Sequence, residues 1–171
     1  MKTLLLLRHA KSDWGAEYGE DHDRPLARRG RKAAARLGRL LHRADEVPDR
    51  IVSSTALRAR ETVRLAMEAG GWACPVELAE GFYRSTPQEV LTVVRSWDHA
   101  AERVLLAGHE PTWSALAGAL IGGGTVRMPT AATARIDFRA ASWGEVAFGE
   151  GTLQWLVVPS LTVKARKRRE G

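Results

Sequence analysis

The sequence feature that most constrains the fold is a run of four leucines, residues 4–7, which ends abruptly at Arg8 and His9. A segment that is apolar at every position suits a strand buried on both faces. In open α/β sheets, ligands bind where such strands end. An arginine offers a fixed charge and a planar fork of donors for phosphate, and a neutral imidazole is a nucleophile near pH 7. The run therefore predicts a buried strand with a phosphoryl-transfer site at its end.

An Arg-His pair can also end a strand simply because the chain reaches solvent. The residues at other strand ends therefore help to decide between a surface position and an anion site. His109 follows a second apolar run, within the segment Gly108-His109-Glu110-Pro111. Arg58 and Arg60 follow a third run, residues 51–53. Three predicted strand ends thus offer two histidines and three arginines, which favours a shared anion site over three separate surface positions.

Strands and helices alternate along most of the chain. We expect strands over residues 2–7, 51–53, 76–78 and 104–107, and helices over 27–44, after Thr55, after Thr86 and after Pro111. From Thr133 to Val158 the pattern becomes that of a hairpin. This order predicts an α/β fold: a three-layer α/β/α sandwich with a mostly parallel sheet and antiparallel pairing near the C-terminus.

Spacing also predicts local details of the helices. In the first helix the apolar stripe is expected at Ala33, Leu37, Leu40, Leu41 and Ala44. Serines and a threonine before Arg58 can cap the second helix, which Gly70-Gly71 ends. Thr86, Pro87 and Glu89 form the pattern of a capping box with proline in the first turn.

Composition and charge narrow the possible partners. A chain of 171 residues with 44% hydrophobic residues is expected to form one domain, here residues 1–163. Residues 164–171 carry four of the six net positive charges, which predicts a basic tail rather than a nucleic-acid-binding surface. No stretch is long enough to span a membrane, and the leucine run is too short for a signal peptide. The single cysteine, Cys74, excludes an internal disulfide, so we expect a structural thiol and a cytoplasmic location.

Four segments together resemble the histidine phosphatase superfamily, and within it the small SixA-type phosphohistidine phosphatases. They are LLLLRHAKSDW, DHDRPLARRGRKAA, IVSSTALRARETV and VLLAGHEPTW, in the same order as in that group and spread over residues 1–120. The resemblance implies that His9 is the nucleophile that takes the phosphoryl group and passes it to water. It also implies that Arg8 and Arg58 bind the phosphate and that His109 is the second histidine of the pocket.

The proton donor stays open at this point. Glu80, within LAEGFY, occupies roughly the place of the acidic residue used by the phosphoglycerate mutase branch, and Asp21 and Asp23 are the alternatives. An imidazole leaving group is readily protonated, so a phosphoramidate substrate depends less on a dedicated acid than an ester does.

Several neighbours of the leucine run are candidates for substrate contact or metal binding. Lys11 and Ser12 reach the phosphate or shape the loop, and Trp14 is the tryptophan expected to meet substrate. The segment Asp21-His22-Asp23 has the residue types of metal ligands, but surrounding arginines would repel a divalent ion. We therefore expect no metal and no cofactor.

The predicted function is a metal-independent phosphatase with a phosphohistidine intermediate. Residues 79–103 have room for one helix and a short loop, so no large lid is expected, and an open site suits phosphohistidine in a protein. A small phosphomonoester is the alternative substrate. A non-catalytic phosphate-binding adaptor is the alternative from another class of protein, although His9 counts against it.

Overall fold

The computed structural model describes residues 1–159, which fold around a six-stranded sheet of order β3-β2-β4-β1-β5-β6. The strands are β1 (Lys2–Arg8), β2 (Arg50–Ser54), β3 (Val76–Ala79), β4 (Arg103–Gly108), β5 (Thr133–Phe138) and β6 (Gly151–Val157). The first four strands are parallel, whereas β5 pairs antiparallel with both β1 and β6. The predicted mostly parallel sheet with an antiparallel C-terminal hairpin is confirmed.

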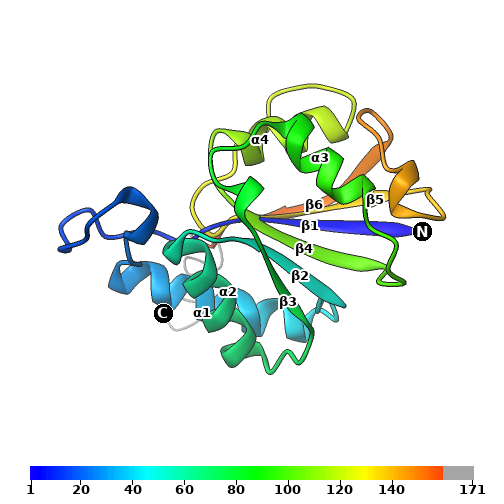
Figure 1. Cartoon of the computed structure of the whole chain (residues 1–171). Coiled ribbons are helices and arrows are strands. Elements are labelled where there is room, and N and C mark those ends of the chain that lie inside the picture. The colour runs from blue at the N-terminus through cyan, green and yellow to red at the C-terminus, as the bar shows by residue number, and fades with distance from the viewer. Residues whose placement is uncertain (160–171) are drawn as a thin grey trace.

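Helices cover both faces of this sheet, as Figure 1 shows. One face carries α1 (Arg28–Arg43) and α2 (Leu57–Gly70), and the other carries α3 (Pro87–Arg95) and α4 (Thr112–Leu120). Short 3-10 turns complete the described chain: η1 (Asp21–Asp23), η2 (Glu80–Phe82) and η3 (Trp143–Glu145). The three-layer α/β/α architecture is therefore confirmed, and no helix within residues 1–159 is long and apolar enough to cross a membrane.

The leucine run is the central part of the core. Leu4 and Leu6 belong to the apolar cluster beneath α3 and α4, while Leu5 and Leu7 belong to the cluster beneath α1 and α2. Alternate side chains of a strand point to opposite faces, so a strand covered on both sides needs an apolar residue at every position. The proposed domain over 1–163 and tail over 164–171 stay predictions, because the tail lies outside the described residues.

The buried stripe of α1 differs from the predicted one. Its buried residues are Gly30, Ala34, Leu37, Gly38 and Leu41. Ala33 and Leu40 are only partly buried, and Ala44 is exposed just beyond the helix. The reason is close contact with α2: a Cβ on Gly38 would lie 1.9 Å from the carbonyl oxygen of Ala66. Periodicity counts apolar side chains and so misses a helix contact made through glycine.

Two predictions about helix ends are confirmed and one is wrong. Gly70 and Gly71 end α2 as predicted. Thr86 and Glu89 form the predicted capping box at α3. At α2 the N-cap is Ala56, and no side chain caps it. The expected caps are used elsewhere, since the Ser54 hydroxyl accepts from the Ala56 N–H and Thr55 pairs with His22. The first turn of α2 is thus left without a side-chain acceptor.

Candidate active site

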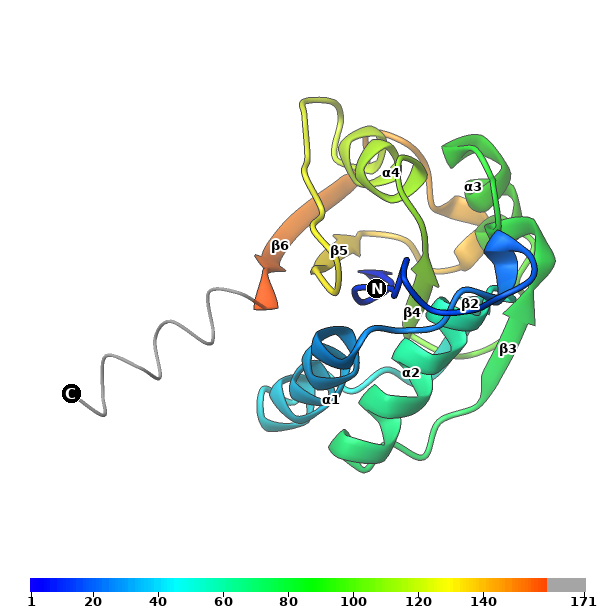
Figure 2. The same ribbon diagram turned by 90° about the vertical axis from the view of Figure 1, so that its left-hand side faces the viewer.

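Three neighbouring strand ends form the candidate site. β2, β4 and β1 are adjacent and parallel, so residues 53–54, 108–109 and 8–9 meet at one edge of the sheet. Figure 2 looks at the molecule from this side. The rings of His9 and His109 lie with their centroids 5.1 Å apart. Tertiary structure thus brings together two histidines that are a hundred residues apart in the sequence.

His9 is held in one tautomer by the backbone carbonyl of the next residue, Ala10. Its Nδ1 lies 2.8 Å from the carbonyl oxygen of Ala10, which can only accept, so Nδ1 carries the proton and Nε2 carries the free lone pair. The adjoining loop is anchored to α2, because the Ala10 N–H donates to Thr62 Oγ1 and the Thr62 hydroxyl donates to the Arg58 carbonyl. The arrangement presents Nε2 as the available nucleophilic atom.

The electrostatic surroundings keep His9 neutral. The residue is only 7% exposed. Burial, and then the charges of Arg58, Arg8 and Arg24, lower the pKa of His9 to about 4. Because protonation would block the lone pair, this shift leaves the imidazole nucleophilic at neutral pH.

His109 is also buried and neutral. Its Nε2 lies 2.8 Å from the hydroxyl oxygen of Ser54 at the end of β2. Its Nδ1 is buried with no hydrogen-bond partner among the described residues. Burial, followed by His9 and Arg58, lowers the pKa of His109 to about 3. One polar atom of this ring is therefore left for a ligand.

Arg58 projects from the first turn of α2 and is only 5% exposed. Its Nη1 donates to the Asp21 carbonyl at 2.7 Å and its Nη2 to the Asp21 carboxylate at 3.1 Å. The Tyr83 hydroxyl donates to the same carboxylate at 2.9 Å. Arg60 is exposed, as its angular position on the helix predicts.

A second buried arginine, Arg24, was missed by the sequence analysis. Its Nε and Nη2 donate to Asp21 at 3.1 and 2.9 Å, and its Nη1 donates to the Ser12 hydroxyl. Its guanidinium carbon stacks 3.5 Å from the centroid of the Trp14 ring. Arg24 lies in the quoted segment DHDRPLARRGRKAA, but periodicity cannot distinguish one buried arginine from several exposed ones.

Ser12 and Trp14 both contact Arg24. Ser12 is buried under Arg24, while Trp14 is exposed apart from that stacking contact. Their direct contact with substrate stays a prediction.

The neighbours of Asp21 favour its carboxylate form. Burial raises its pKa, but the hydrogen bonds from Tyr83 and Arg24 and the charge of Arg58 outweigh this and hold it at about 2. Glu80 is exposed at the start of η2, and its side chain makes no hydrogen bond or ion pair with residues 1–159. Asp23 is exposed as well, 3.4 Å from His22 Nδ1. Glu80, Asp21 and Asp23 all stay candidates for the proton donor.

Asp21 and His22, which have the residue types of metal ligands, are bound to other side chains. The Asp21 carboxylate is bound by two arginines, and His22 Nε2 lies 3.0 Å from Thr55 Oγ1. Within residues 1–159 no three His, Cys, Asp or Glu side chains are grouped so that they could hold a metal ion.

Arg8 is the last residue of β1 and directly precedes His9. Its Nη1 donates to the Met128 carbonyl at 2.9 Å, and its Nε is buried without a partner in the part of the chain that is described. Arg58 Nε is buried and unpartnered in the same way. Arg8, Arg58 and His109 thus each keep one buried nitrogen without a partner, as do residues elsewhere in the described chain such as Arg50 and Trp72.

Comparison with known proteins agrees with this geometry. The family description "Histidine phosphatase superfamily (branch 1)" matches residues 4–83. An uncharacterized protein of Mycobacterium leprae is 37% identical over 122 residues, which cover 70% of this chain and 73% of that protein. Two solved structures, assigned as the phosphohistidine phosphatase SixA, come from Nakamurella multipartitia and Agrobacterium tumefaciens. Each is 28% identical and covers 92% of this chain, with TM-scores of 0.79 and 0.77 over 96% and 98% of their own chains. The chain belongs to the histidine phosphatase superfamily and is SixA-like.

Proposed function

We propose that the protein is a metal-independent phosphatase that works through a phosphorylated His9. Nε2 of His9 attacks the phosphorus atom, the bond from phosphorus to the leaving group breaks, and the leaving group takes up a proton. Water then attacks phospho-His9, which releases inorganic phosphate and restores the free imidazole. The observation that carries this proposal is the neutral His9, whose Nδ1 is held by the Ala10 carbonyl and whose pKa is lowered by burial and by the charges of Arg58, Arg8 and Arg24.

The arginines supply the charge that the reaction needs. Negative charge is spread over three equatorial oxygens of a phosphoryl group in transfer, and positioned cations stabilise it. Arg8 and Arg58 each keep a buried Nε–H without an acceptor in the described chain, and His109 keeps Nδ1. Arg24 and Asp21 hold Arg58 and the loop in place rather than replacing these donors.

Phosphohistidine in a protein is the substrate that we favour. The two SixA structures support this choice at the level of relatives. Between β3 and β4 the chain forms only η2, α3 and loops, which leaves no large insertion to enclose a small ester. The imidazole of phosphohistidine is also a leaving group that is easily protonated, by water or by Glu80 or Asp23.

Rapid-quench trapping with a labelled phosphodonor tests the proposal. We expect label on His9 that is lost in acid and stable in base, and neither label nor turnover in a folded His9→Ala variant. His42→Ala, which changes an exposed histidine of α1, should behave like the parent protein. Near-normal hydrolysis of para-nitrophenyl phosphate by folded His9→Ala would refute the covalent mechanism. A parent protein that binds phosphate but never turns over would instead support the adaptor alternative.

A further inference from the structure

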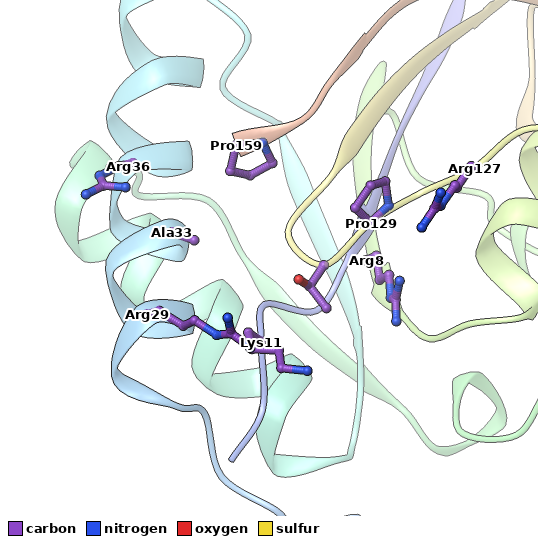
Figure 3. Close-up of a pocket in the computed structure, with 9 residues that line it drawn as sticks. Arg8, Lys11, Arg29, Ala33, Arg36, Arg127, Pro129 and Pro159 are labelled. Atoms are coloured by element: carbon purple, nitrogen blue, oxygen red, sulfur yellow. The ribbon is translucent and has the colours of Figure 1, made fainter. Parts of the chain in front are cut away.

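A basic cavity adjoins the candidate active site. It has a volume of about 540 Å³ and lies between α1 and the segment 127–130 that precedes β5. Figure 3 shows Arg29 and Lys11 on one side of it and Arg8 and Arg127 on the other. Arg36 lies on the same face of α1 as Arg29, about two turns further along the helix. The cationic side chains that line the cavity are therefore Arg8, Lys11, Arg29, Arg36 and Arg127. We call this group the basic cavity.

No aspartate or glutamate is among the side chains that line the basic cavity. The side chains of Lys11, Arg29, Arg36 and Arg127 make no hydrogen bond or ion pair within the described residues. The cavity therefore gathers five positively charged side chains with no acidic side chain in its lining.

Two other arginines on α1 and α2 are paired with acidic residues, unlike those of the basic cavity. Arg31 of α1 pairs with Glu61 at 2.9 Å, and Arg64 of α2 pairs with Glu68 at 3.0 Å. Like charges gathered in a concave surface repel one another and raise the local concentration of anions. Burial lowers the pKa of Arg8 most, Glu110 outside the lining raises it, and Arg127 within the lining lowers it. An anion in the cavity would relieve this repulsion.

The size and the donors indicate which anion fits. Small-molecule sites commonly have volumes of about 300–1,000 Å³, so the cavity can hold a phosphate or carboxylate together with part of its parent molecule. Guanidinium forks bind such oxyanions through paired hydrogen bonds. Arg8, which the resemblance assigns to phosphate binding, also lines the cavity, so the cavity and the candidate active site share this residue.

We propose that the basic cavity binds a second oxyanion of the substrate, so that the enzyme selects phosphorylated molecules that carry another phosphate or carboxylate near the scissile bond. This inference rests on the proposed function, because it takes the phosphoryl group at His9 as the first anion. The second anion belongs either to an acidic side chain beside phosphohistidine or to a small bisphosphorylated molecule.

Binding measurements test the cavity separately from catalysis. Calorimetry would compare ethylphosphonate with alkane bisphosphonates of graded chain length, none of which is hydrolysed. We expect the parent protein to prefer a bisphosphonate, and the double variant Arg29→Gln/Arg36→Gln to reduce that preference about 5- to 30-fold, as expected for two charge contacts. Added salt should weaken the preference as well.

The matched control removes two charges from the same helix outside the cavity. Arg28→Gln/Arg39→Gln changes exposed arginines that do not line it, and the preference should persist. Equal preference in the two double variants, or no preference in the parent protein, would overturn the proposal. Either result is obtained whether or not the protein turns over a phosphate ester, so failure of the cavity and failure of the proposed function are distinguished.

Hydrolysis then distinguishes the two sources of the anion. Phosphohistidine peptides flanked by aspartate would be compared with the same peptides flanked by asparagine. A higher kcat/KM for the acidic peptides that depends on Arg29 and Arg36 assigns the cavity to acidic protein side chains. If only bisphosphonates show the dependence, the second anion belongs to a small molecule.

Discussion

Replacing Arg58 by lysine should separate charge from geometry in the candidate active site. Arg58 is 5% exposed, and two of its nitrogens are held by Asp21 while Nε is left buried without an acceptor among the described residues. Lysine keeps the positive charge but has one compact ammonium in place of the planar fork. It cannot both hold Asp21 in this way and donate to a phosphoryl oxygen.

The magnitude follows from the loss of one charge-assisted hydrogen bond, which is worth about 1.5–3 kcal/mol. We therefore expect Arg58→Lys to lower kcat/KM by about 10- to 100-fold. Most of the loss should fall on kcat, because the phosphoryl group flattens in the transition state and the fork then matters most.

The assay is steady-state hydrolysis of para-nitrophenyl phosphate, with thermal unfolding followed by circular dichroism to show that the variants fold. Arg60→Lys is the control, because Arg60 lies two residues further along α2 and is exposed. Its activity should be close to that of the parent protein. If Arg60→Lys is as damaging as Arg58→Lys, or if Arg58→Lys has no effect, Arg58 is not a phosphate ligand.

Three further predictions concern pH, metal and packing. Burial first, and then neighbouring charges, lower the pKa of His9 to about 4 and that of His109 to about 3, so between pH 6.5 and these values only the unfolded chain takes up the two protons. The free energy of unfolding, measured in urea, should therefore fall on the order of 3 kcal/mol from about pH 7 to pH 5, and by roughly half as much in His9→Asn. A flat profile would contradict the shifts. A strong chelator should leave hydrolysis unchanged, because arginines supply the charge; loss of activity that one divalent ion restores would overturn this. Gly38→Ala should destabilise the fold by about 1–3 kcal/mol because its Cβ would collide with the Ala66 carbonyl, whereas Gly19→Ala, which meets no atom within 4 Å, should change stability little when both are measured by urea unfolding.

The sequence by itself determined the layers of the fold and the chemistry of the strand ends. Residues 4–7 are apolar at every position, which requires cover on both faces of the strand whatever the rest of the chain does. The capping box at Thr86 and Glu89 is likewise a local pattern, and the structure forms it as expected. Patterns of this kind are readable because each depends on residues only a few positions apart.

Only the tertiary structure decided how the candidate site is built. Asp21 joins Arg24, Arg58 and Tyr83, and the last of these is 62 residues away in the sequence. The burial that lowers the pKa of His9 exists only after β1, β4 and α2 have packed. Nor does any local pattern show that residues 8–11, 29–36 and 127 surround one cavity. The physical reason is that periodicity reports which face of an element is buried, whereas ion pairs, pKa shifts and cavities depend on which distant elements that face meets.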